Sequence, residues 1–185
     1  MIRLMEKTFA FRLSQLAFSC CLLFIFLSPA VYADSDTEQQ IKVSFIYNFA
    51  KFVTWPNLSN ANAPLLICVS GSQPLSASIS LLQGKKVGSH TIQVNALGKN
   101  KTMTECNMLF VSESEMPQLQ EILAPLAGQP VLTVSTIAGF TQAGGMIGMK
   151  ELDNRLRFDI NLIAAKKANV SIASQLLQLA DEVIQ

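Results

Sequence analysis

Histidine and charged residues are scarce in this chain of 185 residues. Its single histidine excludes metal sites built from several histidines, and any serine–histidine or cysteine–histidine catalytic pair would depend on His90 alone. Charged residues make up 15%, with 14 Lys+Arg against 13 Asp+Glu. This near-neutral balance excludes a polybasic nucleic-acid-binding protein, because phosphate neutralisation needs clustered Lys and Arg.

Glycine motifs that would indicate catalysis or nucleotide binding are also missing. No G-x-S-x-G nucleophile elbow occurs, and Ser70-Gly71-Ser72 follows an expected strand without that pattern. Gly144-Gly145 lacks the further glycines of a phosphate-binding loop and precedes a strand, which favours a turn or bulge. No spacing supports a metal, haem or nucleotide. We therefore expect no cofactor and no enzymatic activity.

The N-terminus explains much of the 50% hydrophobic content. Three basic residues precede an apolar run, roughly Leu13–Leu27, and Val31 and Ala33 place small residues before Asp34. This pattern predicts a secretory signal peptide over residues 1–33, cleaved after Ala33, and a single domain over residues 34–185. The alternative is an uncleaved anchor helix, although the run is shorter than the ~20 residues that span a bilayer comfortably.

Cleavage would change the charge and the cysteine count. Arg3, Lys7, Arg12 and Glu6 would leave, so that 11 Lys+Arg and 12 Asp+Glu would remain. Two of the four cysteines would remain as well, Cys68 and Cys106. An exported compartment is oxidising, so this pair predicts a disulfide, which the chain-entropy model values at roughly 4 kcal/mol. A catalytic thiol is the alternative, but Cys68 lies in an apolar run, where burial raises the pKa of a thiol.

Helical and strand patterns alternate along the rest of the chain. A first helix is expected over about residues 36–53, with capping-box spacing at Ser35 and Glu38, and Trp55-Pro56 ends it. Short apolar runs then alternate with helical stretches, which predicts a mostly parallel sheet covered on both faces. The expected strands are 65–69, 91–94, 108–111 and 131–134, and the expected helices are 74–82 and 114–126.

The last third predicts a hairpin and further helices. Residues 146–149 and 156–160 read as two strands around a turn at 151–154, which makes the sheet mixed. Asn161 can cap a helix that Asn169 interrupts, and a final helix is expected over 174–183. The predicted fold class is α/β: a mostly parallel mixed sheet flanked by helices on both faces, with a C-terminal β-hairpin and helices.

Charged residues near two strand ends are the remaining candidates for a site. Strand alternation places Arg155, Arg157 and Asp159 on one face, which suits either a partner surface or ordinary cross-strand pairing. Glu113 and Glu115 follow a strand, where α/β sheets open ligand crevices, but acids there equally suit a helix N-terminus. A loop histidine is the simplest interpretation of His90.

Five segments resemble a known family, in order and over nearly the whole chain after residue 33. The opening signature is KVSFIYNFAKFVTWP at residues 42–56, and CNMLFVS at 106–112 resembles the central segment. Residues 130–135 (PVLTVS), Phe140 and 144–147 (GGMI) resemble the next segment. RLRFDIN at 155–161 and SIASQLL at 171–177 resemble the close. The chain is thereby identified as similar to the YfiR family.

The resemblance implies a periplasmic repressor. It would bind the periplasmic region of an inner-membrane diguanylate cyclase and so regulate cyclic-di-GMP signalling and biofilm formation. An outer-membrane lipoprotein would sequester the repressor, and members can form homodimers. Cys68 and Cys106 match the commoner cysteine pair of the family. The partner surface of the family implies Ile147 and Asp159 as partner-binding residues here, with Phe140 and Lys167 as neighbouring candidates.

Two other functions remain open at this point. A small-ligand binding protein acting on another membrane signalling partner would use a crevice near Ser70, Gly71 and Glu113. A hydrolase would need a serine together with His90.

The cysteine pair makes the first testable prediction. We expect the exported protein to show no free thiol when it is unfolded without reductant and treated with Ellman's reagent, because Cys68 and Cys106 would be bonded to each other. The same sample unfolded with reductant, then freed of it, should show two thiols. Two thiols in the unreduced sample would eliminate the disulfide.

Overall fold

The computed structural model describes residues 33–58, 60, 62–97 and 102–185. The chain divides into two units, Met1–Ser35 and Asp36–Gln185. The signal peptide predicted over residues 1–33 lies outside the described residues except for Ala33, so its cleavage stays a prediction. Every contact below belongs to the second unit.

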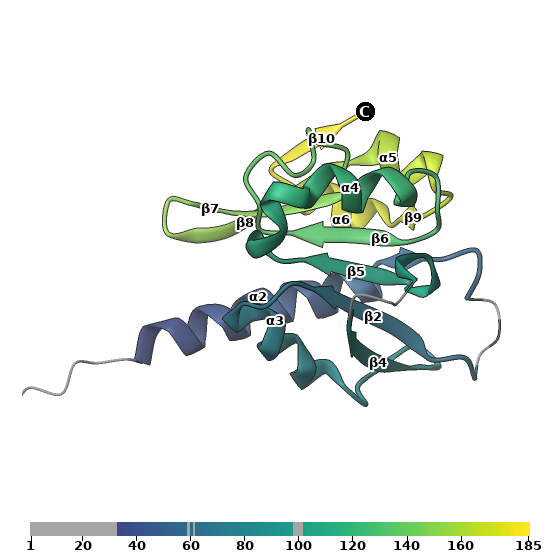
Figure 1. The fold of residues 1–185 in the computed structure, drawn as a ribbon, viewed down its shortest axis with the longest axis horizontal. Coiled ribbons are helices and arrows are strands. Elements are labelled where there is room, and N and C mark those ends of the chain that lie inside the picture. Colours follow the sequence, from purple (N-terminus) through teal and green to yellow (C-terminus); the bar gives the residue numbers. More distant parts are fainter. Residues whose placement is uncertain (1–32, 59, 61, 98–101) are drawn as a thin grey trace, which may run out of the picture. The chain divides into compact units, whose positions relative to one another are not determined.

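A mixed sheet is the centre of this unit, and its eight described strands run in the order β10-β8-β7-β6-β5-β2-β4-β3 (Figure 1). Only β7–β8 and β3–β4 pair in antiparallel fashion; the other neighbours pair in parallel. The α/β class with a mostly parallel mixed sheet is confirmed. The strands are β2 (Leu65–Ser70), β3 (Lys86–Val87), β4 (His90–Ala96), β5 (Met108–Val111), β6 (Leu132–Ser135), β7 (Ile147–Leu152), β8 (Arg155–Asn161) and β10 (Glu182–Ile184).

Helices cover both faces of the sheet, as predicted. One face packs against α2 (Ala33–Lys51), α3 (Pro74–Ser78), α5 (Leu162–Lys167) and α6 (Ser174–Leu179), which share the larger hydrophobic core. The other packs against α4 (Leu119–Leu123) and holds the smaller core. Within β5, Met108 and Phe110 join the larger core, while Leu109 and Val111 join the smaller one. This is the two-sided burial that a continuous apolar run predicts.

Several helix predictions need correction. The stretch 74–82 is α-helical only at α3 and continues as a 3-10 helix over Ile79–Leu82. The stretch 114–126 is α-helical only at α4, and 3-10 turns over Glu113–Gln118 and Ala124–Leu126 flank it. Each turn contains a proline, Pro117 or Pro125, which lacks the N–H that an α-helix needs. The final helix ends at Leu179 and not at residue 183. The residues after it form β10, because the open edge of β8 offers backbone hydrogen bonds to an extended chain.

A second, two-stranded sheet was not predicted. It pairs β1 (Val53–Thr54) with β9 (Ser171–Ile172) in antiparallel fashion. The first helix therefore ends at Lys51, two residues before the predicted end at 53. This pairing joins the segment after α2 to the connection between α5 and α6.

Candidate functional site

The hairpin of β7 and β8 extends beyond the body of the sheet (Figure 1). β6 pairs with β7 only at Ile147 and Gly148, whereas the β7–β8 pairing continues to Leu152 and Arg155. Asp153 and Asn154 both have positive φ angles, 52° and 56°, as two-residue hairpin turns require. The predicted turn at 151–154 therefore lies in the right place, and the hairpin ends in a two-stranded ribbon.

The two faces of the hairpin differ in chemistry. Phe158 points to the larger core, where its ring lies 5.1 Å from the Phe49 ring and 6.1 Å from the Phe45 ring, centroid to centroid, so that it joins β8 to α2. Arg157 and Asp159 lie on the opposite face, because successive side chains of a strand alternate. α4, which covers that face further along the sheet, packs within the smaller core and not at this end.

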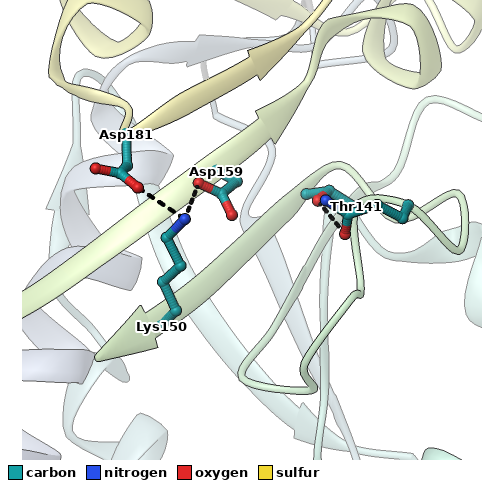
Figure 2. A network of polar contacts seen from close by, with 5 residues as sticks. Thr141, Lys150, Asp159 and Asp181 are labelled. Atoms are coloured by element: carbon teal, nitrogen blue, oxygen red, sulfur yellow. Dashed lines mark hydrogen bonds and ion pairs between the residues drawn. The ribbon is translucent and has the colours of Figure 1, made fainter. Parts of the chain in front are cut away.

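An ionic cluster occupies the polar face of these last strands (Figure 2). The Nζ atom of Lys150 lies 2.8 Å from Oδ1 of Asp159 and 2.7 Å from Oδ2 of Asp181. The three residues come from β7, β8 and the residue just before β10, so one ammonium group links three segments. The backbone N–H of Asp181 also donates to the carbonyl of Phe158 at 2.8 Å. The cluster therefore holds the C-terminal strand against the hairpin.

The cluster shifts the pKa values of two of its members. Hydrogen bonds from Lys150 to Asp159 and then to Asp181 raise the pKa of the Lys150 ammonium above 10.5. The hydrogen bond from Lys150 lowers the pKa of Asp181 below 3.8. Both shifts favour the charged forms, so Lys150 and Asp181 are ionised throughout the neutral range.

The loop between β6 and β7 packs beside Asp159. Gly148 is opposite Asp159 in the hairpin, and a Cβ atom on Gly148 would lie 3.4 Å from the Thr141 methyl group. The Thr141 carbonyl accepts a hydrogen bond from the Asn161 side chain at 2.8 Å. Gly145 has no room for a side chain, because a Cβ atom there would overlap the Phe140 ring. Gly144-Gly145 thus belongs to a tightly packed turn, as favoured over a phosphate loop.

The four implied partner-binding residues do not form one exposed surface. Phe140 and Ile147 are 1% and 0% exposed, and they belong to the smaller and larger core respectively. Asp159 is 8% exposed, whereas Lys167 is exposed on α5. Phe140 and Ile147 can therefore act on a partner only by setting the position of the loop and of β7.

Lys167 lies beside a cavity of about 270 Å³. Apolar side chains of α4 and α5 line it together with Thr133 and Asn161. Both polar side chains are already engaged: Thr133 accepts from the N–H of Met146, and Asn161 accepts from the N–H of Ala164 as the predicted helix cap. Lys167 forms none of the ion pairs found among the described residues. Its ammonium group is therefore free to bind an anionic group of a ligand in this cavity.

Cys68 and Cys106 form a disulfide with a Cα–Cα distance of 5.9 Å. Cys68 is on β2 and Cys106 directly precedes Asn107 and β5, and both cysteines are buried. Asn107 reinforces this connection, because its side chain accepts from the N–H of Leu66 at 2.8 Å while its own N–H donates to the Leu66 carbonyl at 2.9 Å. The cross-link therefore joins two neighbouring parallel strands at one end.

The other candidate residues lie apart from the ionic cluster. His90 begins β4, and its Nδ1 lies 2.9 Å from the carbonyl oxygen of Ala63. At the expected crevice, a Cβ atom on Gly71 would lie 2.8 Å from Cβ of Ser112, so the Gly71 backbone packs closely against Ser112. Glu113 is exposed. Among the described residues there is no group of three or more His, Cys, Asp or Glu side chains that could hold a metal ion.

Comparison with known proteins identifies the family. The model of the YfiR/HmsC-like family matches residues 39–181, which is most of the chain and includes every strand of the eight-stranded sheet except β10. The chain belongs to the YfiR/HmsC-like family. Membership supports, at the level of the family, a periplasmic regulator of cyclic-di-GMP signalling.

A solved structure shares the fold. It is a conserved domain protein from Vibrio cholerae O1 biovar El Tor, 10% identical to this chain, with a TM-score of 0.53. The match covers 76% of this chain and 59% of that one, so this chain spans well under two thirds of its length. Across the part of the chain described here, no helix is both long and apolar enough to cross a membrane.

Sequence reasoning found Asp159 but missed Lys150 and Asp181. Lys150 pairs with Arg157 in the hairpin, and strand alternation puts Arg157 on the same face as Asp159. Combining the predicted turn at 151–154 with strand alternation could therefore have placed Lys150 on that face. Asp181 carried no such signal, because its position depends on β10 pairing with β8.

The ionic cluster generates a stability prediction. We expect Lys150→Gln to lower the free energy of unfolding at neutral pH by about 1–2 kcal/mol, between the values for exposed and buried ion pairs, because Asp159 loses its cation. Glu151→Gln is the control, because Glu151 is the exposed neighbour of Lys150 and takes part in none of the described ion pairs. It should lower the free energy of unfolding much less. Chemical denaturation of both variants checks this.

The same variant should change the pH dependence. The pKa of Asp181 is lower in the folded protein than its ordinary value of 3.8. The ionised Asp181 therefore contributes fully to the free energy of unfolding above pH 3.8, and this contribution is lost as the pH falls through the lowered pKa. The raised pKa of Lys150 preserves its contribution until the pH rises past 10.5. The stability difference between wild type and Lys150→Gln should therefore be constant near neutrality and shrink in acid. A difference that is independent of pH would contradict the cluster.

Proposed function

We propose that this chain is a periplasmic repressor that binds the periplasmic region of an inner-membrane diguanylate cyclase. The observation that supports the proposal most is the family match over residues 39–181. The signal peptide predicted over residues 1–33 would deliver the chain to that compartment. To repress, the chain must bind the inactive state of the cyclase more tightly than the active state, because equal affinity for both would shift nothing.

The polar face of the hairpin is the docking surface in this proposal. Arg155 and Arg157 are exposed on it, and arginine is enriched at protein interfaces because its planar group pairs with carboxylates in two places. Asp159 acts there by holding Lys150 in position beside the arginines. Ile147 and Phe140 contribute from beneath, as buried supports of the strand and the loop. Lys167 would contact the partner separately, from α5.

Release of repression belongs to the same proposal. An outer-membrane lipoprotein that binds the chain would compete with the cyclase and so restore cyclic-di-GMP synthesis. A homodimer would present two such faces at once. Both elements come from the family resemblance.

A second candidate function is a small-ligand sensor acting on another membrane signalling protein. The cavity of about 270 Å³ beside Lys167 favours it, since apolar walls with one cation suit a small amphipathic anion. This cavity lies apart from the crevice predicted near Ser70, Gly71 and Glu113, which stays a prediction.

The cellular test measures intracellular cyclic-di-GMP in the native host. Deletion of the chain should raise the level, and restoration with residues 1–33 intact should return it to the starting value, because repression acts from outside the inner membrane. Restoration without residues 1–33 is the control and should leave the level high. An unchanged level on deletion, under several envelope stresses, would refute repression of a cyclase.

The docking surface has its own test in the restored strain. Asp159→Lys should weaken repression, because it removes the carboxylate that holds Lys150 and adds a second ammonium beside it. Glu121→Lys, an exposed change of the same charge on α4, is the control. Arg157→Glu tests the exposed part of the same face while leaving Lys150, Asp159 and Asp181 unchanged in sequence, in case Asp159→Lys fails to fold. Full repression by an exported and folded Arg157→Glu chain would rule out this face.

A further inference from the structure

Charge is distributed very unevenly along this nearly neutral chain. No Asp or Glu occurs between Glu38 and Glu105, and this acid-free stretch, residues 39–104, carries six lysines. From residue 105 onward nine acids outnumber five bases. The six lysines are Lys42, Lys51, Lys85, Lys86, Lys99 and Lys101.

The fold gathers the acid-free stretch at one end of the sheet. It supplies α3 and the strands β2, β4 and β3, which are consecutive and end the strand order. It also supplies most of α2, which contacts both ends of the sheet: Tyr47 bonds to Lys86 at this end, and Phe49 packs against Phe158 of β8. Figure 1 shows these elements together in one half of the folded unit. The opposite end of the strand order, residues 147–185, carries the ionic cluster and balances five acids against five bases. The excess of positive charge therefore lies at the β3–β4 end of the sheet.

Tyr47 organises the lysines at the basic end. The Nζ atoms of Lys51 and Lys85 each lie 5.6 Å from the centroid of the Tyr47 ring, one from α2 and the other from the turn before β3. The Tyr47 hydroxyl donates to the backbone carbonyl of Lys86 at 2.8 Å. Three exposed lysines from two separate segments thus surround one tyrosine; we call Tyr47, Lys51, Lys85 and Lys86 the basic cluster.

Nothing in the described part of the chain neutralises the basic cluster. The ion pairs there involve Lys42 and Lys150, and none involves Lys51, Lys85 or Lys86. An apolar side chain is also close in sequence: Leu81, four residues before Lys85, is 59% exposed. Cations beside a tyrosine and an exposed leucine form the combination that adsorbs at the headgroup layer of a membrane.

The choice of lysine favours a lipid surface over a protein partner. The acid-free stretch contains six lysines and no arginine. Lysine is a strongly hydrated point charge and is depleted at protein interfaces, whereas arginine recognises carboxylates with fixed geometry. Diffuse attraction to a negatively charged bilayer needs no such geometry, and each lysine near the surface strengthens it.

We propose that the basic cluster, with Leu81, adsorbs the domain to a bilayer surface that contains anionic phospholipid. The contact is peripheral: lysines attract lipid phosphates, and Tyr47 and Leu81 reach the headgroup boundary. This inference goes beyond the proposed repression and needs no cyclase. Adsorption would confine the domain to the membrane surface, where a membrane-anchored partner is found.

Sedimentation with lipid vesicles tests the proposal on the purified protein. One set of vesicles is phosphatidylcholine, and the other holds equal parts of phosphatidylcholine and phosphatidylglycerol. Wild type should bind the second set more tightly, and added salt should weaken this binding, because exposed charges are screened. The triple change Lys51→Gln, Lys85→Gln and Lys86→Gln should weaken it by roughly 10- to 100-fold.

A second triple variant makes the comparison specific. Arg155→Gln, Lys166→Gln and Lys167→Gln remove the same net charge from exposed positions outside the acid-free stretch, and should leave vesicle binding close to wild type. If apolar residues of the N-terminus are kept in the purified protein, they would raise vesicle binding of every variant equally. They therefore cannot produce a difference in binding between the two triple variants. Equal loss in both triple variants, or no preference for phosphatidylglycerol, would overturn the proposal. Binding of the basic cluster to an acidic protein but not to vesicles would also overturn it.

Discussion

The structure depends on burial of its central strands on both faces. β5 and β6 are buried along their whole length and β2 along most of it, so helices must cover them from two sides. This cover stops at the β7–β8 hairpin, where one side chain in two becomes polar. The place where two-sided burial ends is also the place where Lys150, Asp159 and Asp181 meet. The candidate partner surface is thus a direct result of the way the sheet is covered.

The polar end of the sheet combines rigidity with exposure. Phe158 packs against α2 on one side, and the Lys150 ammonium links three segments on the other. The exposed arginines therefore project from a hairpin that is held on both faces. Interfaces that change little on binding lose less conformational entropy, which suits a regulator that must distinguish two states of a partner.

The basic cluster and the ionic cluster lie at different ends of the sheet. The basic cluster lies at the β3–β4 end of the strand order, and the ionic cluster lies at the β8–β10 end. A domain that adsorbs through the first end keeps the second available for a protein. The disulfide between Cys68 and Cys106 ties β2 to the segment before β5, between these two ends, so that both belong to one cross-linked sheet.

Local sequence determined the elements that carry their own signals. The apolar runs predicted β2, β5 and β6, Asn161 predicted the cap of α5, and the alternation of helical and strand patterns predicted the α/β class. Features that depend on residues distant in the chain became clear only from the tertiary structure. The end of the predicted final helix, Glu182 and Val183, is a strand because it pairs with the edge of β8. Asp159 is buried at the position opposite Gly148, where it pairs with Lys150. Hydrogen bonds to a strand edge, and the pairing of a carboxylate with an ammonium group, cannot be read from the residues next to them.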